Sequence, residues 1–181
     1  IEIYKSLGVI YLRQRNFEAA GNIYRLILDL APADAEAYFY LANIQYELNK
    51  KGEAVEGLIK AIELRPDYPE ALNYLGYMYV EENRDLDQAE VMIRKALELD
   101  PNNGAYLDSL GWFYFRKGKV AEALKELKKA VSLMDDPVIY DHLGEAYLKS
   151  SDIENARLNW QKALKLDPKQ DKIKKKLEKL K

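Results

Sequence analysis

Apolar residues return along this chain with a helical spacing, and the same pattern of them recurs about every 34 residues. Near the start, Tyr4, Leu7, Gly8 and Tyr11 stand at positions i, i+3, i+4 and i+7, which is one face of an α-helix. The leucine of this set recurs once in each of five successive segments: Leu7, Leu41, Leu75, Leu110 and Leu143. A fixed period of this length indicates stacked helical hairpins rather than one globular core.

Small residues recur with the same period. The residue after each recurring leucine is Gly8, Ala42, Gly76, Gly111 or Gly144. A second apolar face follows in every segment and starts from an alanine: Ala20, Ala54, Ala89, Ala123 and Ala156. Small residues at both places let two helix axes approach to about 8–10 Å, so each segment predicts two antiparallel helices.

The proline pattern and the lysine-rich end of the chain divide it further. Four of the five second helices are followed by a residue that cannot continue a helix: Pro32, Pro66, Pro101 and Pro168. We predict five hairpin units, with these bounds: 1–34, 35–68, 69–103, 104–136 and 137–168. Residues 169–181 place Ile173, Leu177 and Leu180 on one helix face among lysines, which predicts a basic capping helix. The third unit has one extra residue in its inter-helix turn, and the fourth lacks its closing proline.

At these residues the chain resembles the tetratricopeptide repeat (TPR) family, over nearly its whole length. The resemblance implies an all-α fold: a right-handed α–α superhelix (solenoid) of five TPR helical hairpins plus a C-terminal capping helix. Stretches 99–112 and 136–144 are also similar to the last repeats of large bacterial TPR lipoproteins, some of them periplasmic adaptors for processing proteases. The location stays open between a periplasmic or outer-membrane-anchored parent and a cytoplasmic one.

Composition narrows the classes of partner. No apolar run approaches the ~18 residues of a membrane span, so we expect no direct membrane insertion. The chain has no cysteine, which excludes disulfides, thiolate metal sites and cysteine nucleophiles. Residues 169–181 hold seven lysines and two acidic residues, net +5, so the remainder carries −7 of the total −2. An acidic body without a basic stripe argues against nucleic acid, and an RNA-binding repeat is only a remote alternative.

The first segment starts abruptly on Ile1, Ile3 and Ile10, without a counterpart of the basic cap. We infer that further repeats precede it in a longer parent protein. The same uncapped edge offers a route to self-association. A homo-oligomeric structural scaffold that assembles through its ends is therefore the main alternative function.

A ligand would bind on the other side of the first helices. Positions 2, 5, 9 and 12–13 of each unit lie roughly 140° from the packing face, and stacking aligns them into a concave wall. Aromatic side chains there anchor ligands at low entropy cost, and asparagines can bind a peptide backbone. The predicted peptide-binding residues are Phe39, Asn43, Asn73, Tyr77, Asp108, Trp112 and Phe115. Packing between repeats is the alternative for all of them, and the stronger one for Phe115.

The ligand chemistry follows from charge. Some family members clamp acidic peptides with Lys or Arg at positions 2, 5 and 6 and Asn at position 9. Here only Lys5 and Asn43 fit, in different units, and Glu2, Glu36 and Glu70 hold position 2. We therefore expect a protein or peptide ligand that is apolar or aromatic and neutral to mildly basic.

Nothing in the sequence suggests an enzyme. His142 is the only histidine; it adjoins Asp141 at the edge of the wall, where we expect it mainly as a surface residue. No nucleophile is placed beside it, and no phosphate loop or metal-ligand spacing is present, so we expect no catalytic residue, cofactor or metal. The predicted function is a protein–protein interaction module, an adaptor or assembly scaffold that binds a peptide segment in its concave groove.

Overall fold

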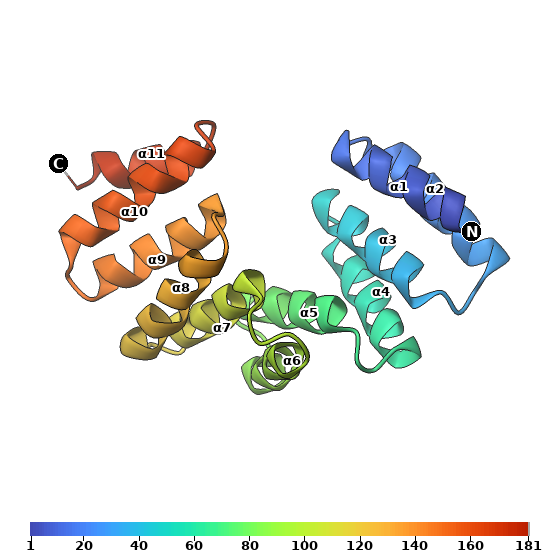
Figure 1. The fold of residues 1–181 in the computed structure, drawn as a ribbon, viewed down its shortest axis with the longest axis horizontal. Coiled ribbons are helices and arrows are strands. Elements are labelled where there is room, and N and C mark those ends of the chain that lie inside the picture. The colour runs from blue at the N-terminus through green and yellow to red at the C-terminus, as the bar shows by residue number, and fades with distance from the viewer. Residues whose placement is uncertain (181) are drawn as a thin grey trace. The chain divides into compact units, whose positions relative to one another are not determined.

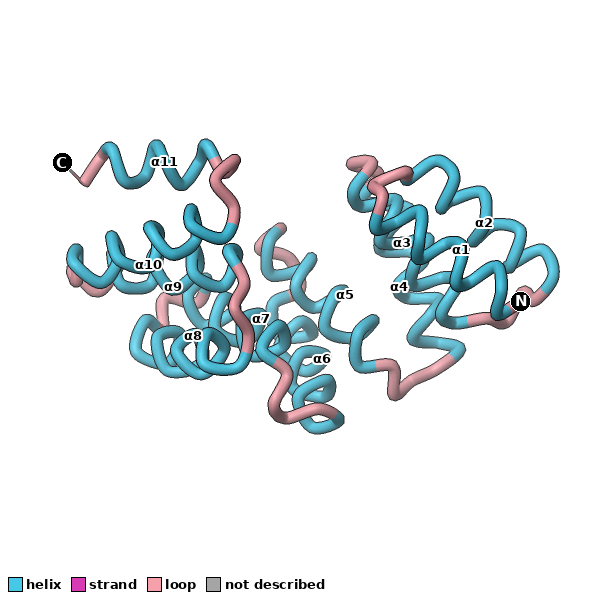
Figure 2. The backbone as a smooth tube through the Cα atoms, turned by 45° about the horizontal axis from the view of Figure 1, so that its top comes forward, coloured by secondary structure: helices cyan, strands magenta, loops and turns pink. Residues whose placement is uncertain are grey.

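The computed structural model describes residues 1–180, which are helical with no β-strand (Figures 1 and 2). The predicted all-α class is thereby confirmed. Eleven helices occupy this range: α1 (Glu2–Arg13), α2 (Phe17–Leu30), α3 (Ala35–Glu47), α4 (Lys51–Leu64), α5 (Pro69–Glu81), α6 (Leu86–Leu99), α7 (Gly104–Arg116), α8 (Val120–Leu133), α9 (Pro137–Lys149), α10 (Ile153–Leu166) and α11 (Asp171–Glu178).

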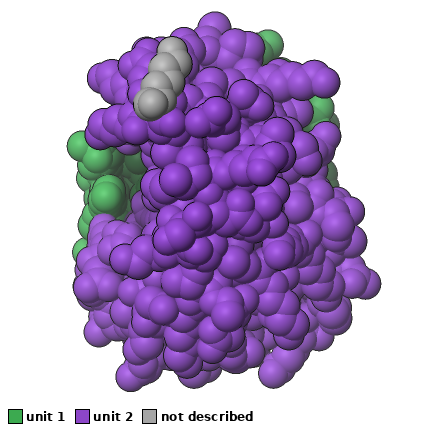
Figure 3. Space-filling view, turned by 90° about the vertical axis from the view of Figure 1, so that its left-hand side faces the viewer, with its two compact units in different colours: residues 1–75 green, residues 76–181 purple. Residues whose placement is uncertain are grey.

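The chain forms two compact units, Ile1–Leu75 and Gly76–Lys181, coloured separately in Figure 3. Their boundary falls inside α5, whereas the sequence offered only boundaries between hairpins. Two helices lie within each of the five predicted ranges, and α11 lies within the sixth. The division into five repeat domains itself stays a prediction.

Local chemistry sets the helix ends. Asp34 is the N-cap of α3, where its side chain accepts a hydrogen bond from the backbone N–H of Ala37, and Asn103 caps α7 in the same way. The turn inside each hairpin needs a left-handed residue, supplied by Arg15, Asn49, Asn83, Gly118 and Ser151. Asp85, with φ +46°, adds a second left-handed residue in the third hairpin. The extra residue read from the sequence is accommodated there, outside both helices.

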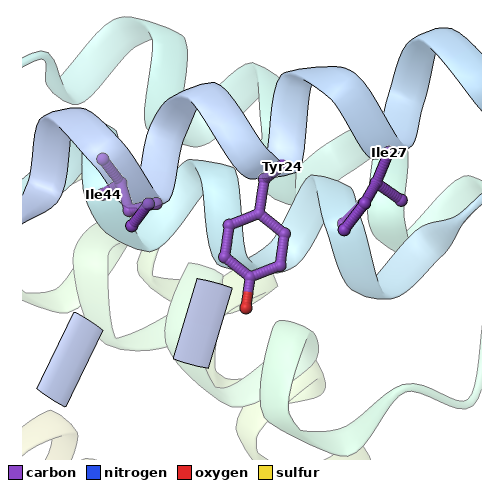
Figure 4. Packing of buried hydrophobic residues seen from close by; sticks show 5 residues of the cluster. Tyr24, Ile27 and Ile44 are labelled. Carbon is purple, nitrogen blue, oxygen red and sulfur yellow. The ribbon is translucent and has the colours of Figure 1, made fainter. Parts of the chain in front are cut away.

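In unit 1 the core forms where α2 packs against α3. Tyr24 and Ile27 of α2 and Ile44 of α3 are all at most 2% exposed (Figure 4). Gly8 of α1 makes this possible, because a Cβ at that position would lie 2.7 Å from Cζ of Tyr24. The small residue after the recurring leucine thus leaves room for a large one on the second helix.

Unit 2 repeats this arrangement and closes it with α11. Trp160 of α10 is 1% exposed, and a Cβ on Gly144 of α9 would lie 2.5 Å from its Nε1. Ile173 of α11 is fully buried in the same cluster, with Leu177 and Leu180 packed against it. The predicted capping helix is therefore present, with its apolar face turned inward.

Candidate functional site

The clearest cluster of candidate residues lies in unit 2, on α5, α7 and α9. The indole of Trp112 stacks on the imidazole of His142, with ring centroids 4.1 Å apart and planes 12° apart. Phe115 stacks on the same indole at 4.7 Å and 9°, and the Tyr77 ring lies 6.4 Å from His142. We call Tyr77, Asp108, Trp112, Phe115 and His142 the Trp112 cluster.

The imidazole of this stack forms a buried pair with a carboxylate, that of Asp108. His142 and Asp108 are 7% and 6% exposed, and His142 Nδ1 lies 2.9 Å and 3.0 Å from the two carboxylate oxygens of Asp108. Burial alone lowers the pKa of His142, but the charge and hydrogen bond of Asp108 outweigh it, so the pKa is raised above its usual 6.5. The imidazole is thus held in place and favoured in its charged form.

The surface position expected for His142 is wrong, because the side chain is buried. Its partner Asp108 is 34 residues away, on the first helix of the preceding hairpin. Asp108 is at repeat position 5 and His142 at position 6, so a comparison of these positions in adjacent units was the available signal. Helices packed side by side bring such offset positions together.

Trp112 is also held by its polar edge. Its Nε1 donates a hydrogen bond to the Glu81 carboxylate, 2.5 Å away, and Nη1 of Arg116 donates to the Glu81 backbone oxygen at 3.3 Å. Glu81 ends α5, whereas Trp112 and Arg116 belong to α7. The indole is therefore oriented from a neighbouring first helix as well as by stacking.

Exposure divides the predicted residues of this unit. Tyr77, Trp112 and Phe115 are half-buried, so each residue keeps part of its surface in contact with solvent. Asp108 is buried, and both its oxygens face His142. The three aromatic residues can therefore contact a ligand directly. Asp108 instead holds His142, which stacks on Trp112.

Three further predicted residues lie in unit 1. Phe39 is half-buried in an aromatic group, with ring centroids 5.2 Å from Tyr68 and 6.4 Å from Tyr74. Asn43 Nδ2 donates to the backbone oxygen of Phe39, one helical turn earlier, at 2.8 Å. Asn73 Oδ1 is buried without a hydrogen-bond partner in the described structure. Each amide therefore has one end engaged or enclosed, and only its other end can face a ligand.

Lys5, the one cation that matched the acidic-peptide clamp, is already paired. Its Nζ lies 2.9 Å from Asp34 and 2.8 Å from Glu36. Burial alone lowers the pKa of Lys5, but the hydrogen bonds that its ammonium donates to these two carboxylates raise it overall. Its positive charge is neutralised by these two carboxylates, so Lys5 is not available to bind a carboxylate ligand.

We also looked for a pocket, a metal site and a membrane-spanning helix among the described residues. A surface hollow of about 330 Å³ is lined by Asp135, Tyr140, Lys162, Lys165 and Leu166, none of them a predicted site residue. Among residues 1–180, no group of three or more His, Asp or Glu side chains is arranged to hold a metal. No helix in that range is long and apolar enough to cross a membrane.

Comparison with known proteins gives consistent matches along the chain. Family models described as tetratricopeptide repeat match residues 3–38, 69–103, 92–125 and 138–170. Another, described as TPR repeat, matches residues 43–82. Among solved structures, a thermophilic TPR protein of Thermus thermophilus is similar with a TM-score of 0.81 at 24% identity, over 99% of this chain and 97% of that one.

Curated relatives are similar over part of their length. A TPR repeat-containing protein of Pseudomonas aeruginosa is 32% identical over 114 residues, which are 63% of this chain and 19% of that protein. The mitochondrial import receptor subunit TOM70 of Mus musculus is 26% identical over 126 residues, 70% of this chain and 21% of that protein. This chain thus spans about a fifth of the length of these two relatives.

Proposed function

Because the chain belongs to the tetratricopeptide repeat family, whose repeats are protein-interaction modules, we propose that it binds a peptide segment as an adaptor or assembly scaffold. The proposed ligand contacts of unit 2 are Tyr77, Trp112 and Phe115. Phe39, Asn43 and Asn73 are a separate set of candidate contacts in unit 1. Asp108 acts through His142, as a positioning residue.

The observation that carries this proposal is the stack of Trp112 with Phe115 and His142. Three rings on two helices are held nearly parallel before any ligand arrives, and the indole is fixed by Glu81. Preorganised aromatic side chains lose little entropy on binding, and they are typical anchors of protein interfaces. Half-buried rings in a fixed orientation therefore suit an apolar or aromatic ligand side chain.

Charge supports a neutral or mildly basic ligand. The carboxylates of this surface are already engaged: Asp108 by His142, and Asp141 and Glu145 by Lys176 of α11, at 2.6 Å and 2.7 Å. None of the proposed ligand-contact residues is a cation that could pair with an acidic peptide. Burial of aromatic surface, rather than ion pairing, then supplies most of the affinity, which we expect near micromolar, about 8 kcal/mol.

Fluorescence of Trp112 tests the proposal directly. The chain has two tryptophans, and Trp160 is buried at 1% exposure, so the Trp160→Phe variant reports on Trp112 alone. We would titrate it with three peptides of equal length: apolar-aromatic and neutral, the same with two lysines, and the same with four glutamates. The first two should shift or quench the Trp112 emission at micromolar concentration, and the acidic one should not.

Phe115→Ala in the same background should weaken binding at least tenfold, while circular dichroism shows an unchanged helix content. The matched control is Val91→Ala, because Val91 lies on α6 and is 66% exposed. Equal affinity for the acidic peptide, or unchanged affinity in Phe115→Ala, would contradict the proposed site.

A further inference from the structure

Two large side chains of the repeat are missing where the first hairpin packs on the second. Position 11 of the first helix is Gln45 in the second hairpin and tyrosine in the other four, at Tyr11, Tyr79, Tyr114 and Tyr147. Position 21 of the second helix is Gly21 in the first hairpin and a larger residue in the later ones: Val55, Glu90, Leu124 and Arg157. Gln45 of α3 and Gly21 of α2 line the same hollow, so both reductions in volume occur at one place.

The contact between the fourth and fifth hairpins shows what the larger side chains do. Leu124 of α8 and Tyr147 of α9 stand at these two positions, and both pack against a cluster that includes Leu143. Leu143 is 3% exposed, whereas its counterpart in the second hairpin, Leu41, is only half-buried. The repeat leucine of the second hairpin therefore lacks the cover that its counterpart has.

The missing volume is visible as two adjoining hollows beside α3, which packs against α2 and α4 (Figure 1). One hollow, of about 170 Å³, is lined by Gly21 and Ile44 among others, and the second, of about 360 Å³, reaches Gly57 of α4. Both hollows include Leu41 and Gln45 in their linings. An apolar cavity of about 150 Å³ holds a molecule as large as benzene, so the smaller hollow has room for one large apolar side chain.

Close packing within the chain does not require the glycine at position 21. A Cβ on Gly21 would have as its three nearest neighbours atoms of the flexible Arg25 guanidinium, at 3.4 Å and beyond. Glycine inside a helix is less stable than alanine, and Gly21 lies within α2. The chain therefore keeps a destabilising residue at a place where its own packing would accept a larger one.

Unpaired carboxylates stand at the rim of the hollows. Glu18 and Glu56 are exposed, and neither pairs with a cation among residues 1–180. The cations of the lining are already engaged: Lys50 by Glu53 at 3.4 Å, and Arg25 by a hydrogen bond within α2. An apolar floor with free carboxylates at its edge suits an aliphatic group that is accompanied by a positive charge.

The hollows lie apart from the candidate peptide contacts of unit 1. At roughly 100° per residue, Leu41 and Gln45 lie about 160° around α3 from Phe39 and Asn43. All the lining residues belong to unit 1. A ligand of the hollows would thus use the opposite side of α3 and would leave the candidate peptide contacts free.

We propose that these hollows are a docking site for a partner protein, which inserts one branched aliphatic side chain, such as leucine, beside a lysine or arginine. The aliphatic side chain takes the place that Leu124 occupies between the fourth and fifth hairpins, and it covers Leu41. The cation pairs with Glu18 or Glu56 at the rim. The site is independent of the proposed peptide surface.

Capped dipeptides test the chemistry of the site, with the methyl NMR signals of Leu41 and Ile44 as the readout. Acetyl-leucyl-lysine amide should shift these signals saturably, with a dissociation constant of about 1–10 mM, as expected for one small group. The alanyl-lysine and leucyl-glutamate analogues should bind at least fivefold more weakly, because the first lacks the aliphatic group and the second meets Glu18 and Glu56. Equal binding of the three probes, or no saturable shift with leucyl-lysine up to about 50 mM, would overturn the proposal.

Filling the hollow tests its position. Gly21→Leu supplies the missing side chain, and Gln45→Tyr restores the repeat tyrosine. Each should weaken leucyl-lysine binding at least fivefold and raise the melting temperature, because apolar surface becomes buried. The matched control is Gly52→Leu, which should bind like the native chain, since a Cβ there has nothing within 4 Å and Gly52 lines neither hollow. Undiminished binding in a Gly21→Leu variant with a raised melting temperature would overturn the proposal.

A last comparison separates a protein partner from a small apolar molecule. Isobutanol carries the hydrocarbon of a leucine side chain without a peptide group or a cation. It should bind at least fivefold more weakly than leucyl-lysine in the same NMR titration. Isobutanol that binds as tightly would assign the hollows to a small apolar ligand and would overturn the docking proposal.

Discussion

The first and last helices of the described chain, α1 and α11, each carry a lysine that pairs with two carboxylates. They differ in whether their apolar residues are buried. Lys5 of α1 is held by Asp34 and Glu36, and Lys176 of α11 by Asp141 and Glu145, all four distances lying between 2.6 Å and 2.9 Å. Yet Ile173 is fully buried, while Ile3 is 83% exposed. An ion-paired lysine therefore does not by itself bury the apolar residues of its helix.

The strongest test of this comparison is truncation of the buried isoleucine. Ile173→Ala should lower the free energy of unfolding by about 2–4 kcal/mol, because it removes apolar contacts and leaves a cavity. Ile3→Ala, the same change at the exposed end, should stay within about 0.5 kcal/mol. Urea unfolding followed by circular dichroism measures both. Equal losses would refute the distinction between a buried and an exposed isoleucine.

The small residues of the two end hairpins give a second test. In Gly144→Ala the new Cβ would meet the rigid, buried Trp160 ring, and we expect a loss of about 1–3 kcal/mol. Gly8→Ala meets Tyr24 in the same way but should cost less, because α1 is packed on one side only and can shift. Gly52→Ala is the control: nothing lies within 4 Å of its Cβ, and the helix should gain about 0.5–1 kcal/mol. Thermal melting would order the three variants, and a Gly8→Ala loss larger than that of Gly144→Ala would contradict the argument.

The lysine clamps should contribute little, and equally, at both ends. Lys5→Met and Lys176→Met should each lower the free energy of unfolding by about 0.5–1 kcal/mol, as partly exposed ion pairs do. The difference from the native chain should shrink in about 1 M salt, which screens the charges. A Lys176→Met loss as large as that of Ile173→Ala would show instead that the ion pair closes the end.

The smallest change in stability should come from pH. We expect it in unit 2, because residues 1–75 contain no histidine. Asp108 on α7, Asp141 on α9 and Glu81 on α5 all favour protonated His142, whose pKa is raised above 6.5 although burial opposes this. Its contribution to stability is therefore complete below pH 6.5 and is lost as the pH rises through the raised folded pKa. For one proton the slope cannot exceed about 1.4 kcal/mol per pH unit.

Urea midpoints measured from pH 6 upwards would show this decline in the native chain. The His142→Gln variant is the control, and its stability should change less over the same interval. The same slope in both proteins would assign the pH dependence to other groups.

Much of the fold was readable from the period of 34 residues, whereas the pairing of polar groups was not. The spacing of three apolar residues predicted the capping helix, because a single helix determines which residues share a face: Ile173, Leu177 and Leu180. His142 was expected at the surface and is buried, because its partner Asp108 lies on another helix and no pattern within one helix reveals that contact. The sequence also did not reveal that Nδ2 of Asn43 bonds to the Phe39 backbone within the same helix.

The sequence alone determined the family, the all-helical class and the small residues that let helices approach, because these depend on spacing and side-chain volume. Tertiary structure alone decided that Asp108 and His142 are buried together and that Trp112 is held by both Phe115 and Glu81. It also decided that Lys176 closes on α9 and that Ile3 stays exposed. Such facts depend on how far one helix is rotated and shifted against the next, which packing of whole faces sets and no single helix encodes.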